Sequence, residues 1–149
     1  MATYCKSNLH ATAFNPSLAN HEFEILWVRM KYLNCDFFLG VLYHPPKPVY
    51  NTSDLISYLQ NVFDEIPEIN SPPPVIALAG DFNQIDHGTL LNMGLFSAAY
   101  SDTHKGNKLC RIYCTQPLYD NIKTVLSNIS TAHTAVLAYD REINIGHMK

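Results

Sequence analysis

The stretch VIALAGDFNQ, residues 75–84, constrains the fold more than any other part of the sequence. Five apolar residues follow the prolines of SPPP and run without interruption into Gly80, Asp81, Phe82 and Asn83. An uninterrupted apolar run of this length is typical of a strand that is covered on both faces. Side chains leave the core at the carboxyl end of such a strand, where open α/β proteins usually bind ligands. Asp81 and Asn83 are therefore candidate functional residues.

Length and composition set the class of protein. The chain has 149 residues, enough for one domain, and its 47% hydrophobic and 15% charged residues are typical of a globular rather than a disordered protein. A net charge of -3 gives no sign of the broad basic field of an autonomous nucleic-acid binder. No apolar run approaches the roughly 20 residues needed to cross a bilayer, and the first residues do not resemble a secretory signal. We expect an intracellular protein without a membrane partner.

The four cysteines, at positions 5, 35, 110 and 114, lack the tight pairs that mark a structural zinc site. On a strand, Cys110 and Cys114 would share one face, and a zinc site there would need a further ligand such as His104. Free thiols that are buried or half-buried are the commoner case, so we expect neither zinc nor a disulfide framework.

The order of elements is predicted to be β-β-α-β-α-β-β-β, with short connections. Strands are expected within residues 22–33, 35–46, 75–83, 109–115, 121–130 and 134–139. A helix over 54–66 is expected to end before Pro67 and to present one apolar face, formed by Leu55, Ile56, Leu59, Val62, Phe63 and Ile66. A short helix and a turn at Gly94 are expected within 87–100. Residues 22–139 would form the domain, with frayed termini at 1–21 and 140–149.

Four motifs carry a resemblance to a known family. VLYHPP, VIALAGDFNQ, DTHKGNKLCRIYCTQP and SNISTAHTAVLAY occur in this order over about residues 22–139. They resemble the second half of an endonuclease/exonuclease/phosphatase domain, and most of all the endonuclease domain encoded by non-LTR retrotransposons. The resemblance implies an α/β fold of two packed β-sheets flanked by helices, of which this chain would represent roughly the second half.

The resemblance also implies a chemistry and a set of site residues. Members of the family cleave phosphodiester bonds with Mg²⁺, using an activated water that attacks phosphorus in line. By resemblance, Asp81 would orient or deprotonate the water and supply the matched metal ligand, and Asn83 would help to hold the water. His133 would polarise the scissile phosphate or stabilise its charge, and Tyr43 and Thr103 would contact it. The implied partner is DNA, and the implied location includes the nucleus.

Several positions depart from the family pattern. Cys110 and Ala132 replace two acids, His44 replaces an arginine, and the first half of the domain, with its metal-binding glutamate, has no counterpart upstream of Glu22. Loss of one member of a coupled catalytic site can lower a rate by several orders of magnitude. We therefore expect weak Mg²⁺ binding and a truncated, impaired endonuclease. Whether this chain is an enzyme stays open at this point.

Alternatives exist for the residues and for the function. Asp81 and Asn83 also suit a turn after Gly80, Tyr43 suits a core, and His133 suits packing at the start of the last strand. His87 and His104 are expected to be solvated. The chain could be a non-catalytic remnant or binding module that keeps the fold, or a phosphatase of the same superfamily. An incomplete sandwich would expose an apolar sheet face and free edges, which predicts self-association.

Overall fold

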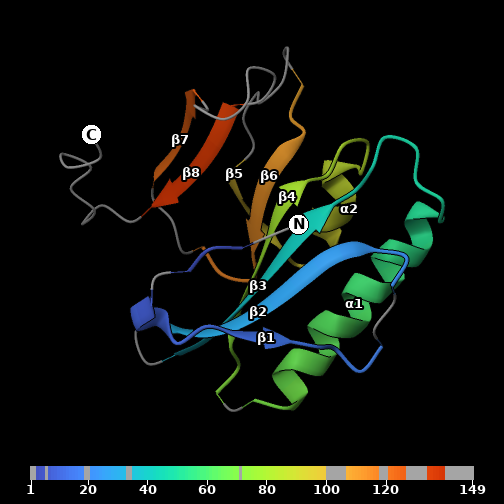
Figure 1. The fold of residues 1–149 in the computed structure, drawn as a ribbon. Coiled ribbons are helices and arrows are strands. Elements are labelled where there is room, and N and C mark those ends of the chain that lie inside the picture. The colour runs from blue at the N-terminus through green and yellow to red at the C-terminus, as the bar shows by residue number, and fades with distance from the viewer. Residues whose placement is uncertain are drawn as a thin grey trace.

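The protein, seen in a computed structural model, is an α/β structure built on one large mixed sheet (Figure 1). The structure describes residues 3–5, 7–18, 21–32, 35–70, 72–99, 107–117, 121–126 and 134–139. The six-stranded sheet has the order β1-β2-β3-β4-β6-β5, with bounds β1 Thr12–Phe14, β2 Glu24–Tyr32, β3 Cys35–Tyr43, β4 Val75–Asp81, β5 Phe96–Ala99 and β6 Cys110–Cys114. Strands β7 (Asn121–Leu126) and β8 (Thr134–Tyr139) pair in a second sheet. The helical elements are α1 (Thr52–Glu68), α2 (His87–Asn92) and the 3-10 turn η1 (Ser7–Leu9). The α/β class expected from the sequence is confirmed.

Strand β4 lies inside the large sheet, between β3 and β6. It runs parallel to β3 and antiparallel to β6. Parallel neighbours need a crossover connection, and α1 supplies it between β3 and β4. The first four residues of β4 are all buried, so the apolar run is covered on both faces as expected: Val75, Ile76, Ala77 and Leu78.

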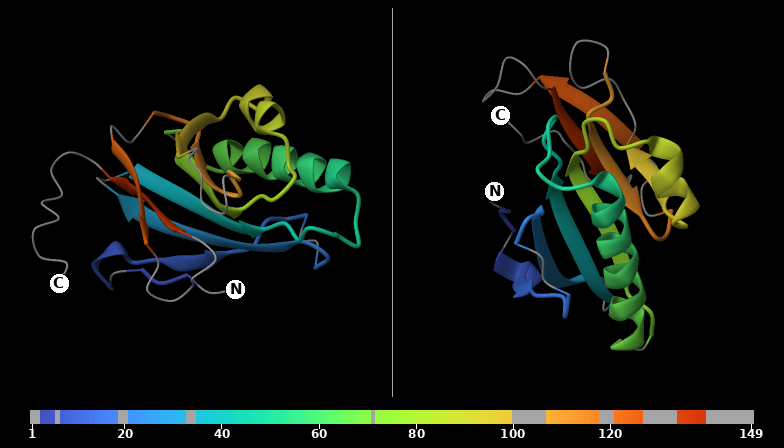
Figure 2. Two further views of the ribbon diagram at one scale, coloured as in Figure 1. Left: turned by 90° about the horizontal axis from the view of Figure 1, so that it is seen from above. Right: turned by 90° about the vertical axis from the view of Figure 1, so that its right-hand side faces the viewer.

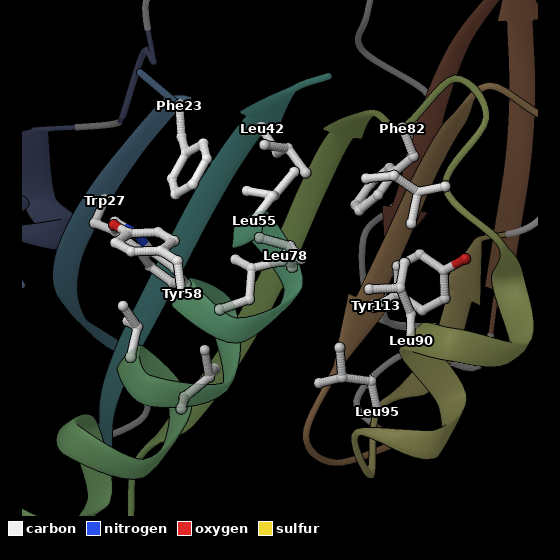
Figure 3. Close-up of a cluster of buried hydrophobic side chains, with 14 of the residues drawn as sticks. Phe23, Trp27, Leu42, Leu55, Tyr58, Leu78, Phe82, Leu90, Leu95 and Tyr113 are labelled. Atoms are coloured by element: carbon white, nitrogen blue, oxygen red, sulfur yellow. The ribbon is translucent and has the colours of Figure 1, made fainter. Parts of the chain in front are cut away.

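One face of the sheet packs against α1. The helix buries Leu55, Tyr58, Leu59, Val62 and Ile66. They pack in one cluster with Trp27, Phe38, Leu42 and Leu78 of the sheet (Figure 3). The sequence predicts this face well except at Tyr58, which is buried and whose hydroxyl accepts the indole N–H of Trp27 at 3.1 Å.

The end of α1 differs from the prediction. Pro67 lies inside the helix, which continues to Glu68. Proline removes the backbone donor at position 67 and distorts the helix locally, but only one helical residue follows it, so the distortion affects no further turn. The turn here is closed by Asn70, whose side-chain amide donates to the Ile66 carbonyl at 2.6 Å and whose backbone N–H donates to Pro67 O at 3.3 Å.

The N-terminal segment is partly ordered by its neighbours. Residues 12–14 form β1, which pairs antiparallel with β2. The backbone N–H and the hydroxyl of Ser17 both donate to the carboxylate of Glu65 on α1, at 3.0–3.1 Å and 2.8 Å. An edge-strand pairing and a helix side chain thus supply hydrogen bonds to residues 12–17, while the domain bounds of 22–139 with frayed termini stay a prediction. Residues 140–149 lie outside the described part of the chain.

The opposite face of the sheet carries a second apolar cluster. Its buried members are Val28, Met30, Phe37, Val75, Ala77, Ala98 and Cys114. The β7–β8 hairpin lies beside β5 and β6, at the part of the sheet away from α1 (Figures 1 and 2). Because these apolar side chains are already buried within the chain, they are not an exposed face, and self-association stays a prediction. Among the described helices, none is both long and apolar enough to cross a bilayer.

Candidate functional site

Two of the predicted site residues, Tyr43 and Asp81, meet at one rim of the large sheet, and Asn83 follows in the loop after β4. Tyr43 at the end of β3 is paired in register with Asp81 at the end of β4, and Asp81 is paired with Cys110 at the start of β6. Directly paired residues project from the same face, here the one that carries Phe37 and Cys114. The predicted residues Thr103 and His133, and also His104, lie outside the described residues.

Gly80 allows β4 to approach β3 at this rim. Its φ is +147°, a conformation that residues with a side chain rarely adopt. A Cβ atom at position 80 would lie 1.8 Å from the carbonyl oxygen of Leu42. The close approach continues one residue further, where the N–H of His44 donates to the Asp81 carbonyl at 2.8 Å. Glycine is thus required immediately before the candidate acid.

Asp81 has one oxygen engaged in the loop and one directed elsewhere. Its Oδ1 accepts the backbone N–H of Asn83 at 3.1 Å, the short-range bond by which aspartate stabilises a turn. Among the residues that the structure describes, Oδ2 has no hydrogen-bond partner. The turn-forming interpretation is therefore correct for one oxygen, and the other remains able to bind a proton, a water or a cation.

Asn83 joins the two rim segments. It adopts a left-handed conformation with φ of +41°, which asparagine tolerates better than most residues. Its side-chain amide donates to the His44 carbonyl at 2.6 Å, and the Gln84 amide donates to the Pro46 carbonyl at 2.9 Å. The loop after β4 is consequently tied to the HPP segment after β3.

His44 lies buried beneath this rim. Its Nδ1 is 3.0 Å from the hydroxyl of Tyr50, and its Nε2 has no hydrogen-bond partner in the described structure. Burial lowers the pKa of His44, and the nearby Asp81 carboxylate acts in the opposite direction. A neutral imidazole therefore stands where the family pattern has the permanent charge of an arginine.

Tyr43 and Cys110 flank Asp81 in the row. The side chain of Tyr43 is 36% exposed, so the interpretation of this tyrosine as a core residue is wrong. Cys110 is partly buried. Because position 110 is directly opposite Asp81, an acid there would face Asp81 across the strand pair.

The described part of the rim offers few ligands for magnesium. They contain no group of three or more His, Cys, Asp or Glu side chains that could hold a metal ion. Mg²⁺ keeps its waters unless one or two well-placed carboxylates hold it. Asp81 is the only acid in the row of Tyr43, Asp81 and Cys110, which makes the site poor in ligands. The same finding gives the zinc hypothesis for Cys110 and Cys114 no support within the described residues.

Two residues near the rim were not predicted. His87 was expected to be solvated, but its Nδ1 lies 2.8 Å from the hydroxyl of buried Tyr113. Burial and then the charge of Arg111 lower the pKa of His87. Arg111 itself is buried and hydrogen-bonds to the loop after β4. The signal that points to it is a lone arginine in the apolar strand LCRIYC, since a buried charge requires polar partners.

Comparison with known proteins gives the fold. No model of a protein family matches the sequence, and no curated protein does. An endonuclease/exonuclease/phosphatase family protein from Leptotrichia buccalis is similar in structure, with a TM-score of 0.60, 19% identity, and coverage of 78% of this chain and 52% of that chain. The endonuclease domain of TRAS1, a telomere-specific non-LTR retrotransposon, has a TM-score of 0.65, 16% identity, and coverage of 87% and 65%.

A third structure, D. rerio TDP2 complexed with a single-strand DNA product, has a TM-score of 0.52, 12% identity, and coverage of 85% of this chain and 64% of that chain. The expected resemblance in fold is confirmed: this chain has the fold of endonuclease/exonuclease/phosphatase proteins. It spans between 52% and 65% of the length of these three structures.

Proposed function

We propose that this chain is a phosphodiester-cleaving DNA endonuclease domain of the retrotransposon type. It cleaves DNA more slowly than a domain that has every residue of the family pattern. The observation that carries the proposal is the row in which Tyr43 and Asp81 end adjacent strands on one face, with Asn83 two residues further on. A row of this kind gathers a hydroxyl, a carboxylate and an amide within reach of one phosphate group.

Each of these residues has a role that its contacts allow. Asp81 Oδ2 orients a water and accepts its proton, while Oδ1 keeps the loop in shape. The carboxamide oxygen of Asn83 holds the same water, because its amide nitrogen is engaged by His44 O. The exposed Tyr43 hydroxyl donates to the phosphate. Thr103 as a phosphate contact and His133 as the stabiliser of phosphate charge are carried over by resemblance.

The slow rate follows from the missing acids. Cys110 and Ala132 stand at two positions where the family pattern has carboxylates, and neither side chain can hold a cation as a carboxylate does. We therefore expect weak, non-saturating binding of Mg²⁺ in calorimetry. Two of the structural neighbours support DNA as the partner, since one is titled as a retrotransposon endonuclease domain and one as a complex with single-strand DNA.

The test is nicking of a supercoiled plasmid in the presence of Mg²⁺, combined with a mobility-shift measurement of DNA binding. Asp81→Ala removes the proposed base. Asp64→Ala is the matched control, because this acid is exposed on α1. We expect slow nicking by the wild type and by Asp64→Ala, and none by Asp81→Ala, with DNA binding kept by all three. Nicking by Asp81→Ala at the wild-type rate would refute the proposal.

A second candidate is a non-catalytic module that binds DNA. It is favoured by the contacts of Asp81 and Asn83, whose side chains already bind backbone groups at the rim loop, residues 82–86 after β4. DNA binding without any nicking, at all Mg²⁺ concentrations, would support this module and overturn the enzyme. Hydrolysis of p-nitrophenyl phosphate without nicking would instead indicate the phosphatase activity of the same superfamily.

A further inference from the structure

Arg111 is a buried cation directly beneath the candidate site. Only 7% of the residue is exposed, and in β6 it is paired with Gly80, the residue before Asp81. Alternation along the strand puts its side chain on the face of Tyr113, opposite to that of Cys110. A buried charge is tolerated only where polar groups surround it, so the contacts of Arg111 indicate what it does.

Within the described part of the chain, the guanidinium group binds three backbone carbonyls. Nη2 donates to Asn83 O at 3.1 Å and Nη1 to Ile85 O at 2.6 Å, so that both lie in the loop after β4. Nε donates to Lys108 O at 2.6 Å, in the segment that leads into β6. One side chain thus joins the loop that follows the candidate acid and carries the candidate amide to the segment that leads into β6.

The ring of Phe82 completes this arrangement. It is fully buried, and the Cζ atom of Arg111 lies 5.8 Å from its centroid, within the range of a cation–π contact. Phe82 also packs edge-to-face on Tyr113 at 5.3 Å (Figure 3). Phe82 stands between Asp81 and Asn83 in the sequence. Because Arg111 contacts the Phe82 ring and binds the carbonyls of Asn83 and Ile85, it restricts the backbone conformation at Asp81 and Asn83.

The geometry points to Arg111 as a positioning residue that sets the orientation of Asp81 and Asn83 without touching the phosphate. Its bond to the Asn83 carbonyl favours the left-handed backbone at that residue, and that backbone directs the Asn83 N–H to Asp81 Oδ1. The inference rests on the proposed function only where it concerns the reaction. The orientation of the loop can be tested without any activity.

The shape of the side chain makes the inference specific. A guanidinium is a planar fork with several fixed donors, whereas an ammonium group is a single compact charge on a flexible stem. Lysine at position 111 would keep the charge and much of the volume, but it would not span carbonyls from two separate segments. Arg111→Lys therefore separates positioning from charge and packing.

The first experiment measures the amide resonances of the rim loop by NMR in Arg111→Lys and Arg111→Ala. Arg29→Lys is the matched control, because Arg29 is exposed on β2 and pairs with Asp36 at 3.0 Å, away from this loop. We expect the amides of Asn83 and Ile85 to shift in both Arg111 variants and to stay in place in the control, with the α1 resonances unchanged. Unmoved Asn83 and Ile85 amides in Arg111→Lys would overturn the inference, whether or not the wild type cleaves DNA.

The second experiment measures the rate constant for plasmid nicking and its restoration by added guanidinium. A displacement of about 1 Å at a catalytic group can cost about 100-fold in rate, so we expect the rate constant for nicking to fall by about that factor while DNA affinity stays within about twofold. Low, non-denaturing guanidinium chloride should restore part of the activity of Arg111→Ala and none of Arg111→Lys, and NaCl at equal ionic strength should restore neither. A wild-type rate in folded Arg111→Lys would refute positioning, whereas a wild type that never nicks removes the proposed function and leaves the resonance test decisive. If Arg111→Ala does not fold, Arg111→Lys carries both readouts.

Discussion

Replacement of Gly80 by alanine should destabilise the protein far more than the same change at Gly94. Both glycines have a positive φ, +147° at Gly80 and +81° at Gly94. A Cβ atom at Gly94 would have no heavy atom within 4 Å, whereas at Gly80 it would lie 1.8 Å from the Leu42 carbonyl oxygen. The pair therefore separates the backbone strain that both variants share from the collision that only Gly80→Ala creates.

The expected magnitudes follow from these contacts. A left-handed conformation costs an alanine about 1–2 kcal/mol, which is the whole expected effect of Gly94→Ala. In Gly80→Ala the colliding atom is backbone, so β3 and β4 must separate at the rim, where His44 N–H donates to Asp81 O at 2.8 Å. Loss of this hydrogen bond and of one neighbouring bond between β3 and β4 adds about 1 kcal/mol each. The total expected loss for Gly80→Ala is about 3–4 kcal/mol.

Urea unfolding followed by tryptophan fluorescence gives both values. Trp27 is the single tryptophan and is 2% exposed, so its emission reports unfolding of the core beneath α1. We expect the midpoint of Gly80→Ala to fall well below that of Gly94→Ala, with similar slopes. Equal losses of unfolding free energy in the two variants would refute the steric argument and the close approach of β3 to β4.

Three further predictions concern titratable groups. The Cys114 thiol, whose pKa burial raises to about 11, should resist iodoacetamide in the native protein while exposed Cys35 reacts; equal labelling by mass spectrometry would contradict this. The pKa of His44 is lowered in the folded protein, so the unfolded chain binds the proton first as the pH falls. The unfolding free energy should therefore decline from about pH 7 to about pH 5, and should decline less in His44→Gln. The same slope of unfolding free energy against pH in the wild type and in His44→Gln would exclude His44 as a cause. Cys110→Asp should put a second carboxylate opposite Asp81 and tighten Mg²⁺ binding in calorimetry. Repulsion between the two carboxylates should also destabilise the metal-free protein at neutral pH, relative to Cys35→Asp. Identical behaviour of the two variants would mean that position 110 does not face Asp81.

The sequence predicted the parts of the fold that depend on local pattern. The apolar run of β4 is buried on both faces, and one apolar face of α1 follows the helical period, so both could be recognised from composition and spacing. Strand β1 could not, because three residues have no usable periodicity and their structure comes from pairing with β2. The extension of α1 past Pro67 likewise depends on a side chain, Asn70, that acts after the helix.

The site was predictable only in part for a similar reason. The end of a buried strand identified Asp81 and Asn83, and the resemblance added Tyr43. The register that places Cys110 opposite Asp81 depends on strands that are distant in sequence, and no local pattern specifies it. The burial of His44 and Arg111 depends on the same tertiary contacts.

The contacts of the rim loop have a consequence for vectorial synthesis. Phe82 N–H donates to Leu109 O at 2.8 Å, and Arg111 holds the Asn83 carbonyl, so the loop is completed by groups that leave the ribosome more than 25 residues later than the loop itself. The sequence from β2 to β4 contains α1 and most of its apolar partners, and it can collapse while the rest of the chain is still being made. Nascent chains released after residue 99 should show the buried fluorescence of Trp27 but rapid hydrogen exchange at Phe82, and slow exchange there would contradict this order. The candidate site would then be among the last parts of the protein to become structured, so that a partly made chain carries its acid and amide without the geometry to use them.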